Sequence, residues 1–421
     1  MTEPRGKHMR VLFATCPNKS IFQYFAPMAW ALRTAGHDVR VAAQPKFADV
    51  ITQAGLTAVP VGRDTPTLEL EDQAVREAGR AGLPPPYDVA EHPEKASWPY
   101  LSSAYRHNVE WWYRVENFPI TADLVAFARW WRPDLVVREP TTFAGAIAAK
   151  ASGAAHARML WGQDVFGIAR GEFLRLRASR PPGDRADPLA EWLGGYGEKY
   201  GFEFTEDMVT GQFTIDQFPA SLQESADLRY VRTRHVPYGG PAVVPDWLRV
   251  PPSRPRVALT MGLSATEHYG GYVVGVGEIL DALSDLDVEV VATVADDQRD
   301  GLVAPDNARV VPYVPWHALT ATCAAVIHHA GGATLATTSL HGVPQLAIPF
   351  HFDQTIYARK LAAHGAGLML DTGRATGQAV REHLLRLLDE PAFGRRAEDL
   401  RDEMLALPSP GELASRLAEL C

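Results

Sequence analysis

A short run of histidine, glycine and threonine at residues 328–334 has the composition of a turn that binds a diphosphate. The segment reads His-His-Ala-Gly-Gly-Ala-Thr. Two adjacent glycines lack the side chains that would keep a ligand away from the backbone. Backbone N–H groups at the start of a helix, together with the helix dipole, bind anions. The pattern therefore favours recognition of a diphosphate by neutral donors.

A predicted strand before this turn and a predicted helix after it give the arrangement that diphosphate binding needs. An apolar run at residues 324–327 predicts a buried strand, and residues 334–341 predict a helix closed by a glycine. His328 and His329 are adjacent at the end of the strand, so their side chains point to opposite faces and cannot both bind one metal ion. One of the two histidines also suits a hydrogen-bonded place in the core.

The alternation of strand and helix extends over both halves of the chain. Strands are predicted at residues 9–15, 38–43, 135–137, 156–161, 256–262, 288–293, 308–311, 324–327 and 345–349. Strands separated by helices form parallel sheets, so we expect an α/β fold of two Rossmann-like domains that face each other across a cleft. The expected divisions are an N-terminal domain at 9–235, a proline-rich linker at 236–255, a C-terminal domain at 256–400 and a tail at 401–421 that returns to the N-terminal domain.

The composition argues against several classes of function. The chain has 421 residues, enough for two domains, and 41 basic against 50 acidic residues give a net charge of −9. Without a basic stripe, this charge argues against nucleic acid or an anionic membrane as the partner. No apolar run is long enough to span a bilayer, and the polar start does not resemble a signal peptide. Three cysteines far apart indicate neither a disulfide framework nor a metal site, so we expect a cytoplasmic protein.

Phrases distributed over almost the whole chain carry a family resemblance. They lie at residues 26–30, 35–37, 54–62, 131–136, 155–162, 211–216 and 236–241, together with the 328–334 turn, Gly342-Val343-Pro344 and Asp353-Gln354. These phrases resemble the inverting GT-B glycosyltransferases of family one, in the actinobacterial group of desosaminyl-, mycaminosyl- and forosaminyl-type transferases. The resemblance implies transfer of a deoxysugar or aminodeoxysugar from a dTDP-sugar to a hydrophobic polyketide- or macrolide-type aglycone in antibiotic biosynthesis.

The resemblance also implies roles for individual residues. Nucleotide and diphosphate would be bound by Gly262, Ser264, Tyr313, Val314, His328, His329, Gly331, Gly332, Ala333 and Thr334. Asp353 and Gln354 would hydrogen-bond to sugar hydroxyls, and Asp353 alone also suits a helix N-cap. Ile21, Phe22 and Trp161 would line the acceptor pocket. Such a design requires no divalent metal and no cofactor beyond the dTDP-sugar substrate.

An aromatic-rich stretch at residues 98–131 bears on protein partners. It suits a packed helical insertion, an acceptor pocket or a docking face for another protein. Several of the resembled enzymes work with a cytochrome-P450-like auxiliary protein bound to the N-terminal domain. The resemblance therefore allows such a partner here, and it leaves a homodimer open.

The usual catalytic base of the resembled family is absent. Inverting transfer to a hydroxyl needs a general base, and in that family it is a histidine in a Ser-His-x-x-x-x-x-Pro phrase. Residues 20–27 here read Ser-Ile-Phe-Gln-Tyr-Phe-Ala-Pro, so Ile21 takes the histidine's place. Glu139 corresponds to the acid that orients the histidine, and Asp164 is expected on a loop facing the cleft.

Three hypotheses follow from the missing histidine. In the first, Glu139 or Asp164 acts as the base. In the second, the acceptor atom is a carbon or nitrogen, as in C- or N-glycosyltransferases. In the third, the chain is a catalytically silent partner subunit.

Overall fold

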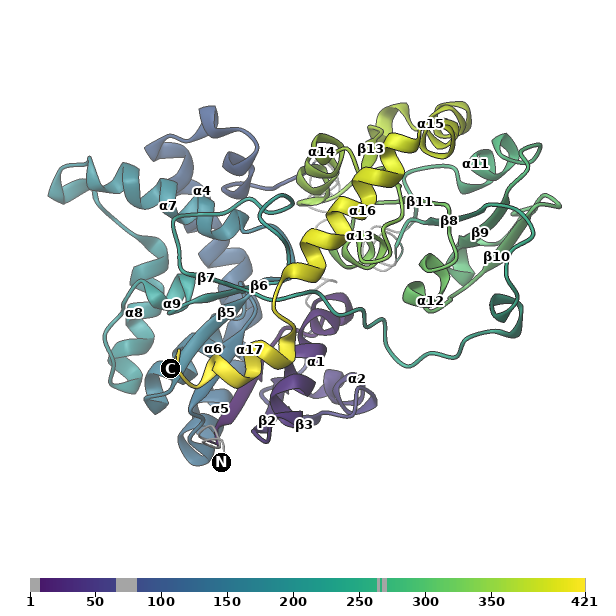
Figure 1. Ribbon diagram of the computed structural model, residues 1–421. Helices are drawn as coiled ribbons and strands as arrows, with labels where there is room; N and C mark the ends of the chain where they lie inside the picture. The colour runs from purple at the N-terminus through teal and green to yellow at the C-terminus, as the bar shows by residue number, and fades with distance from the viewer. Residues whose placement is uncertain (1–7, 66–81, 263–265, 267–270, 421) are drawn as a thin grey trace.

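Two parallel β-sheets, one in each half of the chain, form the framework of the molecule (Figure 1). The computed structural model describes residues 8–65, 82–262, 266 and 271–420. Within these residues the first sheet has seven strands, in the order β3-β2-β1-β4-β5-β6-β7, and the second has six, in the order β10-β9-β8-β11-β12-β13. All neighbouring strands are parallel, as the sequence pattern predicted.

The first sheet and its helices come from the N-terminal half. The strands are β1 (Arg10–Ala14), β2 (Asp38–Ala43), β3 (Thr57–Pro60), β4 (Leu135–Arg138), β5 (Ala155–Met159), β6 (Thr214–Asp216) and β7 (Tyr230–Arg232). The helices are α1 (Lys19–Thr34), α2 (Ala48–Gln53), α4 (Trp98–Asn108), α5 (Arg114–Trp131), α6 (Phe143–Ser152), α7 (Val165–Ala178), α8 (Pro188–Tyr200) and α9 (Asp207–Thr210). Every residue of β4 is buried, because helices cover both faces of a parallel sheet.

The second sheet and its helices follow in the C-terminal half. The strands are β8 (Arg256–Thr260), β9 (Glu289–Thr293), β10 (Ala308–Val311), β11 (Ala325–His328), β12 (Gln345–Ala347) and β13 (Gly367–Met369). The helices are α11 (Val276–Ala282), α12 (Trp316–Thr320), α13 (Gly332–Ser339), α14 (Gln354–His364), α15 (Gly377–Asp389), α16 (Pro391–Ala406) and α17 (Pro410–Leu417). Its central strands β8 and β11 are buried throughout.

The end of the chain connects the two halves. Helix α16 runs from the second sheet toward the first, and α17 packs on α1 (Figure 1). A backbone hydrogen bond of 2.7 Å from Arg234 N to Pro408 O joins the start of this connection to the segment after β7. The C-terminal helix therefore belongs spatially to the first sheet.

The aromatic stretch at 98–131 is a nearly continuous helical insertion. A π-helical turn, Val109–Tyr113, joins α4 to α5. Tyr105 and Tyr113 are buried, whereas the side chains of Trp111, Phe118 and Trp130 are 65%, 67% and 71% exposed. The insertion is thus packed on its inner face and apolar at three exposed points.

Helix α1 begins earlier than the pattern of apolar residues predicted, at Lys19 rather than near Tyr24. The Asn18 side chain caps the helix by accepting hydrogen bonds from the backbone N–H groups of Ser20 and Ile21. This cap places residues 20–27 on the first turns of a helix. Among the described residues, no helix has both the length and the apolar character needed to cross a bilayer.

Candidate functional site

The turn between β11 and α13 leaves the start of the helix open. Gly331 is the N-cap residue, and no side chain caps the first N–H groups of α13. Ala330, in the same turn, has a positive φ of 62°. The first four N–H groups of a helix lack partners within it, so the open end can donate to an anion. The open end of α13 therefore contains the residues for which the sequence predicts diphosphate binding, namely Gly331, Gly332, Ala333 and Thr334.

His328 braces this turn from inside the protein. The side chain is fully buried, and its Nδ1 accepts a hydrogen bond of 2.9 Å from the N–H of Ala330. Its Nε2 then carries the proton and donates to Gln345 Oε1 at 2.8 Å. Burial lowers the pKa of His328 to about 3, so the ring is neutral. Because both ring nitrogens are engaged, the geometry supports an indirect role for His328, in shaping the turn at which the sequence predicts a diphosphate.

His329 fills the space between two glycines on the opposite side of the strand. A Cβ built on Gly262 would lie 2.6 Å from Nε2 of His329, and a Cβ on Gly331 would collide with the same ring. Gly262 also has a positive φ of 71°, so glycine is required there for two reasons. Burial lowers the pKa of His329 to about 4. Ser264 lies outside the described residues.

The predicted nucleobase segment lies at the end of β10. Tyr313 is 47% exposed, and its hydroxyl donates to the carbonyl of Gly239 in the linker at 3.3 Å. The next residue, Val314, is buried in the core. The exposed ring of Tyr313 is compatible with the stacking role that the family resemblance implies.

Asp353 lies where the two halves of the molecule meet. Its Oδ2 accepts a hydrogen bond of 2.7 Å from the N–H of Gln163, in the loop after β5. A Cβ on Gly162 would collide with the same carboxylate, so the two loops approach closely. Although Asp353 occupies the N-cap position of α14, its side chain makes no cap hydrogen bond. Gln354 is engaged within its own loop, where Oε1 accepts from Phe350 N at 3.1 Å.

The buried position of Asp353 has a consequence for stability. Burial raises its pKa to about 7, above the value of about 3.9 in an unfolded chain. Between these values the folded protein binds more protons than the unfolded one, so this group costs stability as the pH rises from about 4 to about 7. We expect Asp353→Asn to gain thermal stability relative to the parent protein as the pH increases from 5 to 7.5. Melting curves at several pH values test this, and a difference that is constant with pH would contradict it.

Glu139 and Asp164 are both fully buried, but their partners differ. Glu139 accepts from Thr141 N at 2.8 Å, from Thr141 Oγ1 at 2.9 Å, from Trp161 Nε1 at 3.2 Å and from the Thr142 hydroxyl. Trp161 packs on Phe352 of the second domain, with ring centroids 5.5 Å apart, so this network reaches the junction of the two halves.

Asp164 does not face the cleft, which corrects the expectation from the sequence. Its carboxylate pairs with Arg158 at 2.5 Å, accepts from the Tyr230 hydroxyl at 2.6 Å and caps α7 through Gly167 N at 2.9 Å. The buried cation of Arg158 needs a carboxylate as its partner, and the three contacts occupy both carboxylate oxygens of Asp164. The geometry therefore gives Asp164 a structural role.

The three residues predicted to line the acceptor pocket have different surroundings in the structure. Ile21 is half-buried on the first turn of α1, and Trp161 lies half-buried between the two halves. Phe22 is only 1% exposed and packs edge-on against Phe47 in the core, with ring centroids 5.7 Å apart. Phe22 is thus a core residue in this structure, because consecutive residues of a helix point in different directions.

A small cavity of about 20 Å³ at the carboxyl end of β1 contains residues that the sequence did not indicate. It is lined by Thr15, Cys16, Pro17, Gln44, Glu116, Ile120 and Thr142. Burial, with the nearby carboxylates of Glu139 and Glu116, raises the pKa of the Cys16 thiol, which disfavours a thiolate base there. Cys16 could have been suspected from its place directly after a strand, whereas nothing in the sequence marks Glu116.

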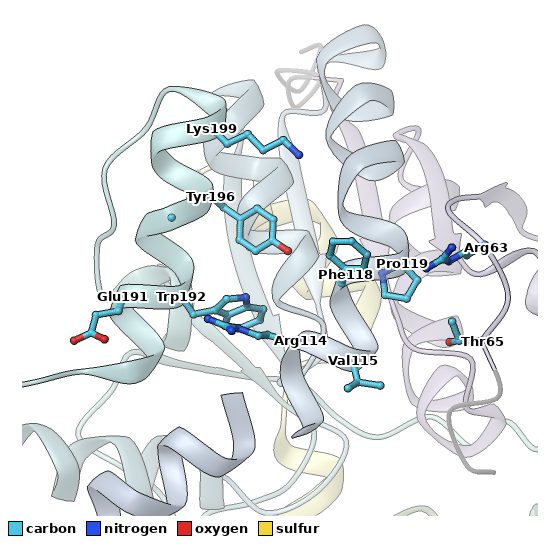
Figure 2. A pocket seen from close by; sticks show the side chains of 11 residues that line it. Arg63, Thr65, Arg114, Val115, Phe118, Pro119, Glu191, Trp192, Tyr196 and Lys199 are labelled. Atoms are coloured by element: carbon cyan, nitrogen blue, oxygen red, sulfur yellow. The ribbon is translucent and has the colours of Figure 1, made fainter. Parts of the chain in front are cut away.

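A larger cavity of about 670 Å³ lies on the first domain alone (Figure 2). Phe118 and Pro119 of α5 lie between Trp192 and Tyr196 of α8 on one side and Arg63 on the other. None of the predicted site residues lines it. In the described part of the chain, no three His, Cys, Asp or Glu side chains are grouped so that they could hold a metal ion.

Comparison with known proteins identifies both halves of the chain. Residues 30–262 match the family model "Erythromycin biosynthesis protein CIII-like, N-terminal domain", and residues 277–420 match its C-terminal counterpart. The 10-deoxymethynolide desosaminyltransferase of Streptomyces venezuelae is 45% identical over 422 residues, which cover 98% of this chain and 97% of that protein.

Two solved structures share the fold. The glycosyltransferase VinC, determined in complex with dTDP, superposes with a TM-score of 0.87 at 40% identity, covering 98% of this chain and 99% of VinC. The spinosyn forosaminyltransferase SpnP superposes with a TM-score of 0.83 at 40% identity and the same coverage. These matches confirm the two-domain GT-B architecture and the resemblance drawn from the sequence.

Proposed function

The chain belongs to the erythromycin biosynthesis protein CIII-like family and is a GT-B glycosyltransferase, and on this basis we propose that it glycosylates a polyketide or macrolide aglycone. The donor in this proposal is a dTDP-deoxysugar or dTDP-aminodeoxysugar, and the configuration at the anomeric carbon is inverted. Residues 9–235 form the acceptor domain and residues 256–400 form the donor domain. The reaction belongs to antibiotic biosynthesis, as it does for the erythromycin-type relatives.

The open N-terminus of α13 is the observation that carries this proposal. It presents unpaired N–H groups beside Gly331 and Gly332, with Asp353 at the start of the next helix. The structure of VinC was determined with dTDP, which supports the same class of ligand here. As the bond between sugar and diphosphate breaks, its electron pair moves to the leaving oxygen, and the helix end stabilises the growing charge. This chemistry requires no divalent metal.

We assign the role of base to Glu139, acting through Thr142. The Thr142 hydroxyl donates to Glu139 and also lines the small cavity at the end of β1. An acceptor hydroxyl in that cavity would pass its proton to Thr142 Oγ1 as the Thr142 proton moves to Glu139. The acceptor oxygen then attacks the anomeric carbon. Such a relay performs the proton transfer of the family's histidine, whose position is occupied here by Ile21. Asp164 takes no part in it.

The other two hypotheses for the missing histidine predict different outcomes. A C- or N-glycosyltransferase would transfer sugar without depending on Glu139, and a silent subunit would transfer none. The relatives at 40% identity or more are named as transferases, which does not favour a silent subunit.

The proposal also includes a protein partner. The side chains of Trp111, Phe118 and Trp130 are exposed at three points of the 98–131 insertion. Exposed apolar side chains can contribute to interaction sites. These three side chains support a cytochrome-P450-like auxiliary protein or a second copy of the chain as a partner of the insertion.

One experiment tests the function and the partner together. The purified chain is mixed with a panel of dTDP-deoxysugars and polyketide aglycones, with and without a P450-like auxiliary protein, and products are identified by mass spectrometry. We expect a glycosylated aglycone from at least one pair and release of dTDP. Turnover of about 1 s⁻¹ or more by the chain alone, an ordinary enzyme rate, would show that no partner is required. Absence of dTDP binding by calorimetry would refute the proposed donor.

A further inference from the structure

Two buried tyrosine side chains lie beside the start of α13. Tyr24 lies on α1 of the first domain and Tyr357 on α14 of the second, and their exposed fractions are 5% and 0%. Neither hydroxyl has a hydrogen-bond partner among the residues that the structure describes. A buried donor without a partner destabilises a protein, and such groups are rare. Two of them at one place therefore indicate a ligand that supplies the acceptors.

Gly332 shows which part of α13 these hydroxyls approach. A Cβ built on Gly332 would collide with the hydroxyl oxygen of Tyr24, and it would lie 3.3 Å from Cε2 of Tyr357. The Cα–Cβ bonds of a helix tilt toward its N-terminus. The Tyr24 hydroxyl therefore lies beside the first turn of α13, where the backbone N–H groups are unpaired. Glycine at position 332 leaves the room that this contact needs.

The surroundings keep both hydroxyls protonated. Burial raises the pKa of Tyr24 and of Tyr357, and the carboxylates of Asp353 and Asp216 raise both further. The ring of His235 packs against Tyr24, with centroids 5.5 Å apart, and burial lowers the pKa of His235 to about 4, so it is neutral. Both tyrosines are thus hydrogen-bond donors at neutral pH. Donors beside a helix N-terminus suit an anion.

We propose that Tyr24 binds the sugar donor from the acceptor domain, by donating its hydroxyl hydrogen bond to an oxygen of the diphosphate at the start of α13. Tyr357 contributes a second hydroxyl from the donor domain. This inference rests on the proposed function, because it takes the ligand at α13 to be a nucleotide diphosphate. The tyrosines transfer no proton: the electron pair of the broken sugar–oxygen bond stays on the diphosphate, and both hydroxyls keep their protons.

The position of Tyr24 links donor binding to the arrangement of the domains. Its helix belongs to the first domain, whereas the diphosphate turn belongs to the second. The contact therefore forms only when the two domains lie together. A hydrogen bond that the Tyr24 hydroxyl donates to the leaving group strengthens as charge grows there, and it therefore lowers the barrier of the reaction. Tyr24 thus makes the closed arrangement the reactive one.

The test compares Tyr24→Phe and Tyr357→Phe with Tyr230→Phe. The Tyr230 hydroxyl is bonded to Asp164 within the first domain, so this variant is the matched control. We expect Tyr24→Phe to weaken dTDP binding and to lower kcat/KM for the donor by about 10-fold or more, the range for a hydrogen bond to a charged group. Without ligand, its melting temperature should be unchanged or higher, because an unpaired hydroxyl has been removed. Tyr230→Phe should melt lower and bind dTDP normally.

The outcomes separate this inference from the proposed function. If the parent protein binds dTDP and Tyr24→Phe binds it equally and turns over at the same rate, the role of Tyr24 is overturned and the function stands. If Tyr24→Phe melts lower and binds dTDP normally, its hydroxyl is structural and the inference fails. If the parent protein does not bind dTDP, the proposed function fails and this inference with it. A loss of affinity in Tyr357→Phe as well would support the second hydroxyl from the donor domain, and unchanged affinity would overturn that part of the inference.

Discussion

Replacing Glu139 with glutamine should reduce kcat per folded molecule by about 100-fold or more, the usual contribution of a general base. The amide cannot accept a proton from Thr142. The glutamine amide also places an N–H group opposite one of the hydrogen-bond donors that contact the Glu139 carboxylate. The free energy of unfolding should therefore fall by about 1–3 kcal/mol as well. Turnover must therefore be divided by the folded fraction, which thermal or urea unfolding measures in parallel.

A pair of variants at Thr142 separates catalysis from stability. Thr142→Val removes the hydroxyl that connects the small cavity to Glu139, and Thr142→Ser keeps it. We expect the valine variant to share the loss of kcat and the serine variant to retain most of the activity. If Glu139→Gln and Thr142→Val both keep full turnover per folded molecule, the relay is wrong. The reaction would then use a nucleophile that needs no carboxylate base, such as a carbon or nitrogen acceptor.

Asp164→Asn should have the opposite profile, with a large effect on stability and none on kcat per folded molecule. Breaking the buried ion pair with Arg158 leaves an uncompensated charge, which costs about 3–5 kcal/mol. Asparagine still offers an oxygen to the N–H of Gly167, so the cap of α7 is preserved in part. Urea unfolding followed by fluorescence measures the change.

An exposed ion pair provides the control for Asp164. Asp184 pairs with Arg180 on the surface, and its side chain is 49% exposed. Solvent and salt screen an ion pair on the surface, so Asp184→Asn should change stability little. A fall in turnover of Asp164→Asn without loss of stability would restore Asp164 as a candidate base.

The architecture could be predicted from the sequence because strands buried on both faces have a local signature. Apolar runs such as residues 257–259 and 324–327 are typical of central parallel strands, and in the structure they lie in or overlap β8 and β11. The glycine-rich turn at 328–334 was recognisable for a related reason, since its backbone chemistry is encoded by consecutive residues. Strands β3, β6, β7 and β13 were not predicted, because each has only three or four residues and none stands out from its surroundings as a longer apolar run.

The roles of single polar side chains depended on partners distant in the sequence. Asp164 is separated from its partner Tyr230 by 66 residues, and Gln163 from Asp353 by 190. From the sequence, Glu139 and Asp164 were equivalent candidates for the base. Only the tertiary structure placed one next to a buried arginine and the other next to a hydroxyl that lines a cavity.

The helix carrying the unusual Ile21 shows the same division between sequence and structure. The sequence by itself determined that the histidine of the family is absent and that the ordinary mechanism is excluded at that position. The tertiary structure decided that Phe22 turns into the core and that Tyr24 reaches the glycine-rich turn of the other domain. A helix directs neighbouring side chains to different surroundings about 100° apart, and what occupies those surroundings is set by elements from the rest of the chain.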